Sequence, residues 1–248
     1  GTYPGAGGTC GTTIASGTCT LGVKFTPATA GRPTQTLTLD YNDGLSGQST
    51  TRDLRGSGVI GSRVSTQGLH SCFIRNNGSL RCWGRNLYGE LGIGSVAYRG
   101  NSGAATVAST PDVDLGTGRT AITVSAGGHH TCALLDDETV KCWGRNTFGA
   151  LGIGDTLDRG DTGGEMGNSL PPVVLGPNKP LQVVTGAAHS CALLSDWSVK
   201  CWGDGGYGEM GQGNGTNQLS PVPVTLSTTL TPRLLAAGGY HNCAIMST

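Results

Sequence analysis

The stretch His70–Gly84, which reads HSCFIRNNGSLRCWG, decides the fold because the chain repeats it. Two further copies begin at His130 and His189. Each copy opens with His-x-Cys and closes on Cys-Trp-Gly, and its second cysteine stands ten positions after its first. A fourth copy opens at His241 and is not completed within the 248 residues. Such internal repetition indicates one structural unit used several times.

Each copy predicts a β-hairpin. The runs Cys132–Leu135 and Thr139–Trp143 have strand-forming residues, and Asp136–Glu138 between them is rich in turn formers. A hairpin centred on the turn sets the first cysteine opposite the second, with Cβ atoms about 4.5–5.5 Å apart, which is close to disulfide reach. The sequence therefore favours the disulfides Cys72–Cys82, Cys132–Cys142 and Cys191–Cys201.

Two other arrangements of these cysteines stay open. They could be free buried thiols, or each His-x-Cys could join the distal cysteine in a metal site. Zinc sites usually use two cysteines with about two to four residues between them, and no cysteines with this spacing are present in the sequence.

Composition favours an all-β protein. Glycine accounts for 44 of 248 residues and charged residues for only 13%, which is typical of short strands joined by tight turns. Lysine plus arginine equals aspartate plus glutamate at 16 each, so nucleic-acid binding is disfavoured. No run of 18 apolar residues is present, so we expect no membrane insertion.

The cysteine content predicts an oxidising compartment, outside the cell or on its surface. Eight of the nine cysteines fall into close pairs, the fourth pair being Cys10 and Cys19, and Cys243 is left over. No signal peptide precedes Gly1, so we expect either processing on export or a longer precursor. The incomplete fourth copy leads to the same expectation.

Residues 1–58 differ from the repeats and form a first predicted domain. Strands are expected at Cys19–Phe25, Thr34–Tyr41 and Thr50–Leu54, with a turn at 42–44. At these residues the segment resembles the C-terminal half of the hydin-like, immunoglobulin-type modules common in bacterial surface proteins. The resemblance implies a partial immunoglobulin-like sandwich, because a whole one needs about seven strands.

Residues 59–248 form the second predicted domain. The first cysteines of successive copies are 60, 59 and 52 residues apart, a period typical of propellers or solenoids. Each Trp-Gly is followed by a tail of the form Gly-x-x-Gly-x-Gly, then by a variable loop and, in two copies, by the expected strands Pro172–Leu175 and Pro221–Val224. With the Ala-Gly-x-x-His marks, these motifs resemble the regulator of chromosome condensation repeat family. The resemblance implies four-stranded β-propeller blades, of which three are complete and one is truncated.

Repeated residues are expected to be structural. The tail glycines are interpreted as turn residues, because no helix follows that could hold a phosphate. The aligned histidines could ring a metal, but we expect each to donate or accept a hydrogen bond to a neighbouring blade: His70, His130, His189 and His241. The tryptophans are expected to wedge between blades: Trp83, Trp143 and Trp202.

Two further kinds of candidate site lie outside the repeat positions. The loop 154–165 carries four carboxylates that are candidate calcium ligands, although most such loops are simply solvated: Asp155, Asp158, Asp161 and Glu165. Asn77 and Asn214 fit the N-glycosylation pattern. We find no catalytic set, since Ser71 and Ser190 lie next to histidines along a strand and point to the opposite face.

The sequence thus predicts a non-enzymatic, exported or surface-displayed structural or adhesive protein without cofactor. Self-association into filaments is a further expectation. Its loops 95–110, 155–171 and 212–220 are expected to bind a protein or a surface glycan. The family resemblance implies two alternatives, a protein inhibitor of an extracellular enzyme and a guanine-nucleotide exchange factor for a nuclear GTPase. Paired cysteines and zero net charge disfavour the second.

Overall fold

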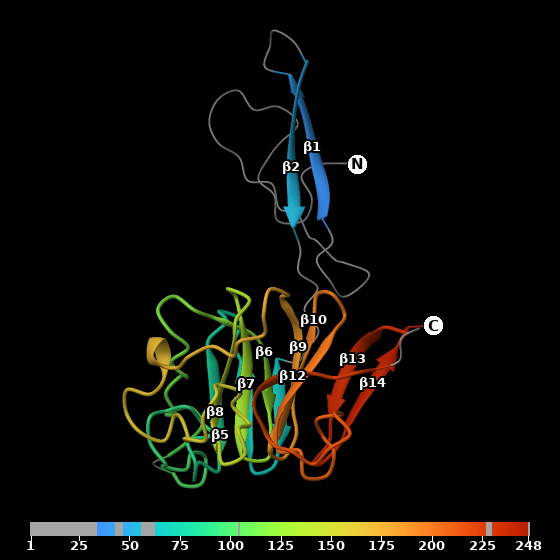
Figure 1. The fold of residues 1–248 in the computed structure, drawn as a ribbon. Coiled ribbons are helices and arrows are strands. Elements are labelled where there is room, and N and C mark those ends of the chain that lie inside the picture. Colours follow the sequence, from blue (N-terminus) through green and yellow to red (C-terminus); the bar gives the residue numbers. More distant parts are fainter. Residues whose placement is uncertain (1–33, 43–46, 56–62, 104, 227–229, 248) are drawn as a thin grey trace. The chain divides into compact units, whose positions relative to one another are not determined.

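The computed structural model describes residues 34–42, 47–55, 63–103, 105–226 and 230–247 (Figure 1). Its regular elements are strands except for one turn of 3-10 helix, η1 (Gly167–Ser169). The chain divides into two compact units, Gly1–Gly58 and Val59–Thr248. Within the described ranges no helix has the length and hydropathy of a membrane span.

In the first unit one hairpin is described. Strand β1 (Thr34–Asn42) pairs antiparallel with β2 (Gly47–Arg55), from Thr34 opposite Arg55 to Asn42 opposite Gly47. These strands contain two that the sequence predicts. The third, Cys19–Phe25, and the predicted pair of Cys10 with Cys19 lie outside the described residues, and the immunoglobulin-like sandwich stays a prediction.

The described residues of the second unit form four antiparallel sheets, which we call blades 1 to 4. Blade 1 contains β3 (Val64–Gln67), β4 (His70–Ile74) and β5 (Leu80–Gly84). Blade 2 contains β6 (Ala121–Ala126), β7 (His130–Leu135) and β8 (Val140–Gly144). Blade 3 contains β9 (Pro180–Thr185), β10 (His189–Leu194), β11 (Val199–Gly203) and β12 (Gln218–Pro223). Blade 4 contains β13 (Pro232–Ala237) and β14 (Asn242–Met246).

Successive blades stand side by side. The first strand of each blade contacts the first strand of the next, β3 with β6, β6 with β9 and β9 with β13 (Figure 1). No closed ring of blades is formed by the residues that the structure describes. The repeat therefore builds a row of like units, each facing its neighbour in the same way.

The hairpins have the register that the sequence predicts. Cys72 lies opposite Cys82, and the same holds for the pairs in blades 2 and 3. In blade 2 the Asp137 carboxylate accepts hydrogen bonds from the backbone N–H of Thr139 at 3.2 Å and from its hydroxyl at 2.7 Å. Such a local bond stabilises the turn.

The prediction that Pro172–Leu175 forms a regular strand is wrong. In the described residues blades 1 and 2 have three strands each. Val173 donates its N–H to the Val140 carbonyl at 2.8 Å, which aligns the segment with β8. Pro171 and Pro172 have no N–H to extend the ladder. In blade 3 the prediction Pro221–Val224 is largely realised, since β12 ends at Pro223.

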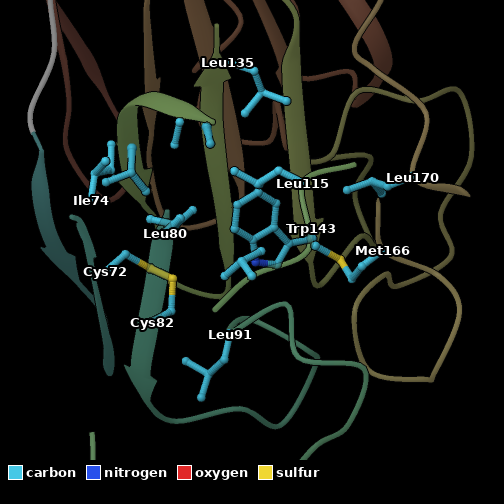
Figure 2. Packing of buried hydrophobic residues seen from close by; sticks show 14 residues of the cluster. Cys72, Ile74, Leu80, Cys82, Leu91, Leu115, Leu135, Trp143, Met166 and Leu170 are labelled. Atoms are coloured by element: carbon cyan, nitrogen blue, oxygen red, sulfur yellow. A yellow bond between two sulfur atoms is a disulfide. The ribbon is translucent and has the colours of Figure 1, made fainter. Parts of the chain in front are cut away.

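The hydrophobic core lies between blades. Trp143 of blade 2 is buried in a cluster with the Cys72–Cys82 disulfide, Leu80 and Leu91 of blade 1 (Figure 2). In the second cluster Trp202 of blade 3 meets the disulfide of blade 2. The first two interfaces thus join the disulfide of one blade to the tryptophan of the next, and burial of these aromatic side chains stabilises the row.

Candidate functional site: inter-blade clamps and an arginine–aromatic face

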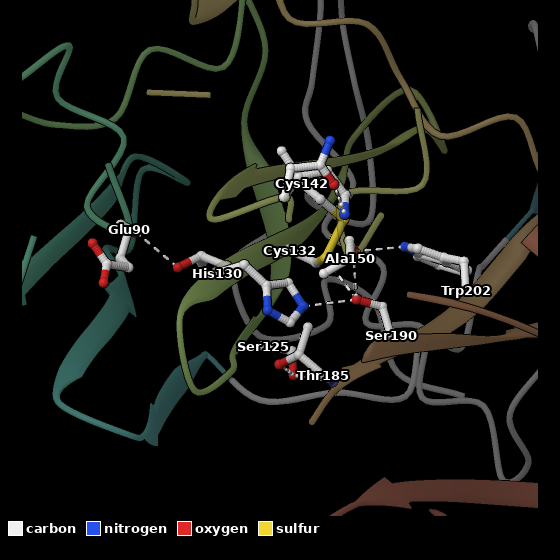
Figure 3. Close-up of a disulfide and its surroundings, with 12 residues drawn as sticks. Glu90, Ser125, His130, Cys132, Cys142, Ala150, Thr185, Ser190 and Trp202 are labelled. Atoms are coloured by element: carbon white, nitrogen blue, oxygen red, sulfur yellow. Dashed lines mark hydrogen bonds between the residues drawn. A yellow bond between two sulfur atoms is a disulfide. The ribbon is translucent and has the colours of Figure 1, made fainter. Parts of the chain in front are cut away.

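A hydrogen-bonded set at the interface of blades 2 and 3 holds the two blades together (Figure 3). His130 Nε2 lies 2.8 Å from Ser190 Oγ in the next blade. Ser190 in turn donates its hydroxyl proton to the Ala150 carbonyl at 3.0 Å, and Trp202 Nε1 donates to the same carbonyl at 2.8 Å. We call this arrangement of histidine, hydroxyl, tail carbonyl and indole a clamp.

The clamp fixes the tautomer of its histidine. The single proton of Ser190 Oγ goes to Ala150, so the oxygen can only accept from His130, which must carry its proton on Nε2. His130 Nδ1 is buried and has no hydrogen-bond partner. It faces Gly127, where an added Cβ would lie 2.8 Å from the ring carbon Cε1. This contact explains the glycine in the Ala-Gly-x-x-His motif.

Burial keeps the clamp histidines neutral. Removal from water lowers the pKa of His130 to about 3, with smaller contributions from His189, His70 and His129. Burial likewise lowers the pKa of His70 to about 4, helped by His129 and Arg85. The pKa of His189 is lowered as well, again chiefly by burial.

The clamp recurs at the other two interfaces. Between blades 1 and 2, His70 Nε2 lies 2.8 Å from Thr131 Oγ1, and the Glu90 carbonyl accepts from Thr131 and Trp143. Between blades 3 and 4, His189 Nε2 lies 3.0 Å from Asn242 Oδ1, and the Asn242 amide donates to the Glu209 carbonyl at 2.9 Å. No indole completes this third clamp within the described residues.

Beside the carbonyls of the clamps lies a group of half-buried and exposed side chains. One cluster combines two arginines with aromatic rings: Arg85, Tyr88, His129, Arg145 and Phe148. Blades 3 and 4 have Tyr207 and Tyr240 at equivalent repeat positions. We call these seven residues together the arginine–aromatic face. The Arg145 guanidinium lies 4.9 Å from the Tyr88 ring centre, and the Tyr88 and His129 rings meet edge to face at 5.8 Å. Tyr207 and Tyr240 are 78% and 60% exposed and stack at 5.2 Å.

This face is positively charged. Arg85 donates to His129 Nδ1 at 3.3 Å, so His129 is an acceptor there and is neutral. Burial lowers the pKa of His129, and the charges of Arg85 and Arg145 lower it further. The carboxylate near Arg85 is that of buried Glu90, 3.7 Å away, and burial raises the pKa of Glu90. No carboxylate of the described chain forms an ion pair with Arg145.

The repeats match two models of one known sequence family. Residues 68–90, 121–150 and 181–209 match one model of the regulator of chromosome condensation (RCC1) repeat, and residues 138–193 and 199–245 match another. Together the matches span more than half of the sequence. The chain belongs to the RCC1 repeat family.

Curated relatives share these repeats. Protein pim1 of Schizosaccharomyces pombe is 30% identical over 187 residues, which are 72% of this chain and 34% of pim1. The probable E3 ubiquitin-protein ligase HERC4 of Homo sapiens is 29% identical over 177 residues, 71% of this chain and 15% of HERC4. The chain thus spans about a third or less of the length of these proteins.

A solved structure shows the same fold. Prp20p from Saccharomyces cerevisiae superposes with a TM-score of 0.61 at 18% identity, over 80% of this chain and 46% of Prp20p. The blades of this protein are therefore those of an RCC1-repeat propeller.

The RCC1 repeat histidines do what the sequence predicts at three of four positions. His70, His130 and His189 each bond the next blade, whereas His241 is exposed in the described structure. The Ser190–His130 contact was missed, because its partners are 60 residues apart. Ser190 does point away from its neighbour His189, as predicted, but toward the histidine of the preceding blade. It is fully buried and donates its proton to a carbonyl, so it is unsuited to be a nucleophile.

The cysteine pairs of the repeats are disulfides in the structure, Cys72–Cys82, Cys132–Cys142 and Cys191–Cys201. Cys243 is a free, exposed thiol. The tail glycines have the positive φ angles expected of turns, for example 80° at Gly89 and 64° at Gly92. An added Cβ at Gly92 would lie 2.7 Å from Trp143 Nε1, so close approach of the indole also requires glycine.

The four candidate calcium ligands are not brought together. Asp155 forms an ion pair with Arg159 at 2.6 Å, and Glu165 accepts the backbone N–H groups of Gly160 and Thr162. Asp158 accepts the N–H of Asn146 at 2.7 Å. In the described ranges no three His, Cys, Asp or Glu side chains are grouped to hold a metal ion. Three of the four carboxylates instead accept hydrogen bonds from nearby donors.

The glycosylation candidates Asn77 and Asn214 are both exposed. Each side-chain oxygen accepts the N–H of the residue two positions later, at 3.1 Å. Glycosylation itself stays a prediction.

Trp143→Phe tests the clamp between blades 1 and 2. We expect a loss of about 1–3 kcal/mol in the free energy of unfolding, because the change removes the bond to the Glu90 carbonyl and part of the buried ring. Trp83→Phe is the matched control, because Trp83 is at the same repeat position but is only partly buried. Urea unfolding that shows equal losses for both variants would contradict the clamp.

Proposed function

We propose that this RCC1-repeat chain is a non-enzymatic platform that binds a protein partner through its arginine–aromatic face, and that it acts in a structural or adhesive role outside the cytoplasm. The observation that carries the proposal is the grouping of Arg85, Arg145 and Tyr88 with further exposed aromatic rings. The face replaces the variable loops as the main contact surface.

The chemistry of the face suits a protein. Tyrosine and arginine are enriched among residues that dominate binding energy, because they bury a large area and donate hydrogen bonds. Arg145 has no carboxylate partner in the described chain, so a partner that brings aspartate or glutamate would gain charge-assisted bonds. The solved relative Prp20p is described with its binding properties to Gsp1p and histones, and a second solved structure is that of Kap60 bound to yeast RCC1 (Prp20). Protein binding by a protein with this fold supports the same role for this chain.

The compartment is part of the proposal. Disulfides persist in oxidising surroundings, and three consecutive blades of the chain each contain one. Clamps and disulfides together give a rigid scaffold, which lowers the entropy lost on binding. An inhibitor of an extracellular enzyme would use the same face and is the alternative that this geometry also favours.

A pull-down from native medium or cell surface under non-reducing conditions tests the proposal. We compare the wild type with Arg145→Glu/Tyr207→Ser, and use Leu157→Ser/Val174→Ser as the matched control because both of its sites are exposed loop residues, at 65% and 78%. The proposal expects a protein captured by the wild type and the control and lost from the face variant. Equal capture by all three would contradict it, and acceleration of nucleotide release from a GTPase would favour the exchange-factor alternative.

A further inference from the structure

In the described ranges asparagine or aspartate stands directly before glycine at three places: Asn77, Asp204 and Asn214. In such a pair the backbone nitrogen of the glycine can attack the side-chain carbonyl carbon, because glycine has no Cβ to hinder the approach. The product is a five-membered succinimide ring. These places are therefore candidate sites of spontaneous modification.

The three side chains form the same local hydrogen bond. In each, Oδ1 accepts the N–H of the residue two positions later at 3.1 Å. This arrangement, an Asx turn, holds the side-chain carbonyl against the backbone that follows it. The side chains therefore do not distinguish the three places.

The glycine nitrogens do distinguish them. Gly78 donates its N–H to the Arg75 carbonyl at 3.0 Å within the hairpin turn of blade 1. Gly205 donates its N–H to Asn217 Oδ1 at 3.1 Å. The N–H of Gly215 has no acceptor among the described residues. Of the three nitrogens, that of Gly215 can lose its proton and attack without first breaking a hydrogen bond within the described chain.

The surroundings of Gly215 also leave room for the ring. A Cβ added there would meet no atom nearer than 3.7 Å. A Cβ added at Gly78 would lie 2.6 Å from Thr120 Cβ, and one added at Gly205 would clash with the Thr216 carbonyl oxygen. The backbone at Gly215 can thus change its shape without displacing packed atoms, whereas the other two glycines are held by their neighbours.

We propose that Asn214 is a site of spontaneous deamidation in the folded protein, and that the fold protects Asn77 and Asp204. Asn214 is exposed to water. The Gly215 nitrogen gives its proton to a solvent base and forms a bond to Asn214 Cγ, and the Cγ–Nδ2 bond breaks as ammonia leaves. Water then opens the succinimide at either carbonyl, which yields aspartate or isoaspartate. The reaction needs no oxidant and no enzyme.

Deamidation changes both the charge and the backbone of loop 212–220. It adds one carboxylate to a chain whose formal net charge is zero, and isoaspartate also lengthens the backbone by one carbon. The same loop holds the tail that carries Tyr207, because Asn217 accepts the N–H of Gly205. The modification therefore alters a segment beside the arginine–aromatic face, whether or not that face binds a partner.

Incubation of the 248-residue chain at neutral pH, after production without N-glycosylation, tests the proposal. Peptide mapping by mass spectrometry follows each site, and enzymatic methylation detects isoaspartate. We expect deamidation at Asn214 to be about tenfold faster or more than at Asn77, a ratio equivalent to about 1.4 kcal/mol. The reason is that Asn77 reacts only after the Gly78 hydrogen bond breaks and the hairpin turn opens. Isoaspartate at Asp204 should be slow for the same reason.

The chain denatured in guanidinium chloride after reduction is the control for sequence effects. Asn77 and Asn214 should react there at comparable rates, because they stand before Gly-Ser and Gly-Thr. A preference for Asn214 that is equally large in the denatured chain would overturn the proposal, since the fold would then not cause it. Equal rates at the two asparagines in the folded chain would overturn it as well.

A variant tests the chemistry of the step. Gly215→Ala should slow the reaction at Asn214 about tenfold or more, because the added Cβ hinders the attacking nitrogen. The space around Gly215 accommodates this Cβ, so urea unfolding should show a stability near that of the wild type. An unchanged rate of deamidation in Gly215→Ala would contradict attack by this nitrogen.

Discussion

Replacing all six cysteines of the three repeat disulfides by alanine lowers the free energy of unfolding of the repeat unit by about 8 kcal/mol. Each bond joins cysteines that are ten residues apart and closes a short loop, so each contributes about 2.5–3 kcal/mol by restricting the unfolded chain. The total is comparable with the whole stability of a typical domain. Without the bonds we therefore expect a largely unfolded chain at 37 °C.

The matched control is Cys243→Ala, because that cysteine is free and exposed. Denaturant unfolding of the six-cysteine variant, of each pair variant and of the control gives the comparison. A pair variant as stable as the control would show that this disulfide does not stabilise the fold. Non-reducing peptide mapping that recovers disulfides between blades would contradict all three pairings.

Lowering the pH from 7.5 to 5 destabilises the repeat unit by about 4 kcal/mol through His70 and His130. Their pKa values in the folded chain are about 4 and about 3, against 6.5 when exposed, so the unfolded chain binds more protons between these limits. Stability therefore falls as the pH drops below 6.5, by about 2 kcal/mol per histidine at pH 5. Glu90 acts in the opposite direction, because burial raises its pKa.

A histidine variant separates this effect from general acid sensitivity. His130→Gln should shrink the loss between pH 7.5 and pH 5 by about 2 kcal/mol, since glutamine does not titrate. His241→Gln, at the exposed repeat position, is the control and should leave the loss as in the wild type. Urea unfolding at both pH values measures all three proteins, and an unchanged loss in His130→Gln would contradict neutral burial.

The hairpins and their cysteine register could be predicted because both depend on residues close together in the chain. A turn centred on Asp137 dictates that Cys132 meets Cys142, whatever the rest of the protein does. The role of the histidines was also predictable, since a residue that recurs in every repeat is expected to serve the contact between repeats.

The arginine–aromatic face and the Ser190–His130 bond could not be predicted in the same way. They assemble from tails of different blades, and a single sequence gives no distance between Arg145 and Tyr88. A signal was present, since arginine follows Trp-Gly and an aromatic residue follows three positions later in both of the first two repeats. The predicted strand Pro172–Leu175 failed because consecutive prolines remove the donors of a ladder.

The central claim is that three equivalent clamps, two of them completed by an indole and each with a neutral histidine protonated on Nε2, lock successive RCC1 blades into a rigid platform. Two-dimensional NMR of ¹⁵N-labelled histidine rings measures both the tautomer and the titration directly. We predict that His70, His130 and His189 show a protonated Nε2 and an unprotonated Nδ1 at neutral pH in the folded chain. In His70 and His130 this state persists to pH 5, and the pKa of His189 is lowered from its usual value by burial. Rings that carry the proton on Nδ1, or that titrate with a midpoint near 6.5, would contradict the clamp and with it the rigid platform.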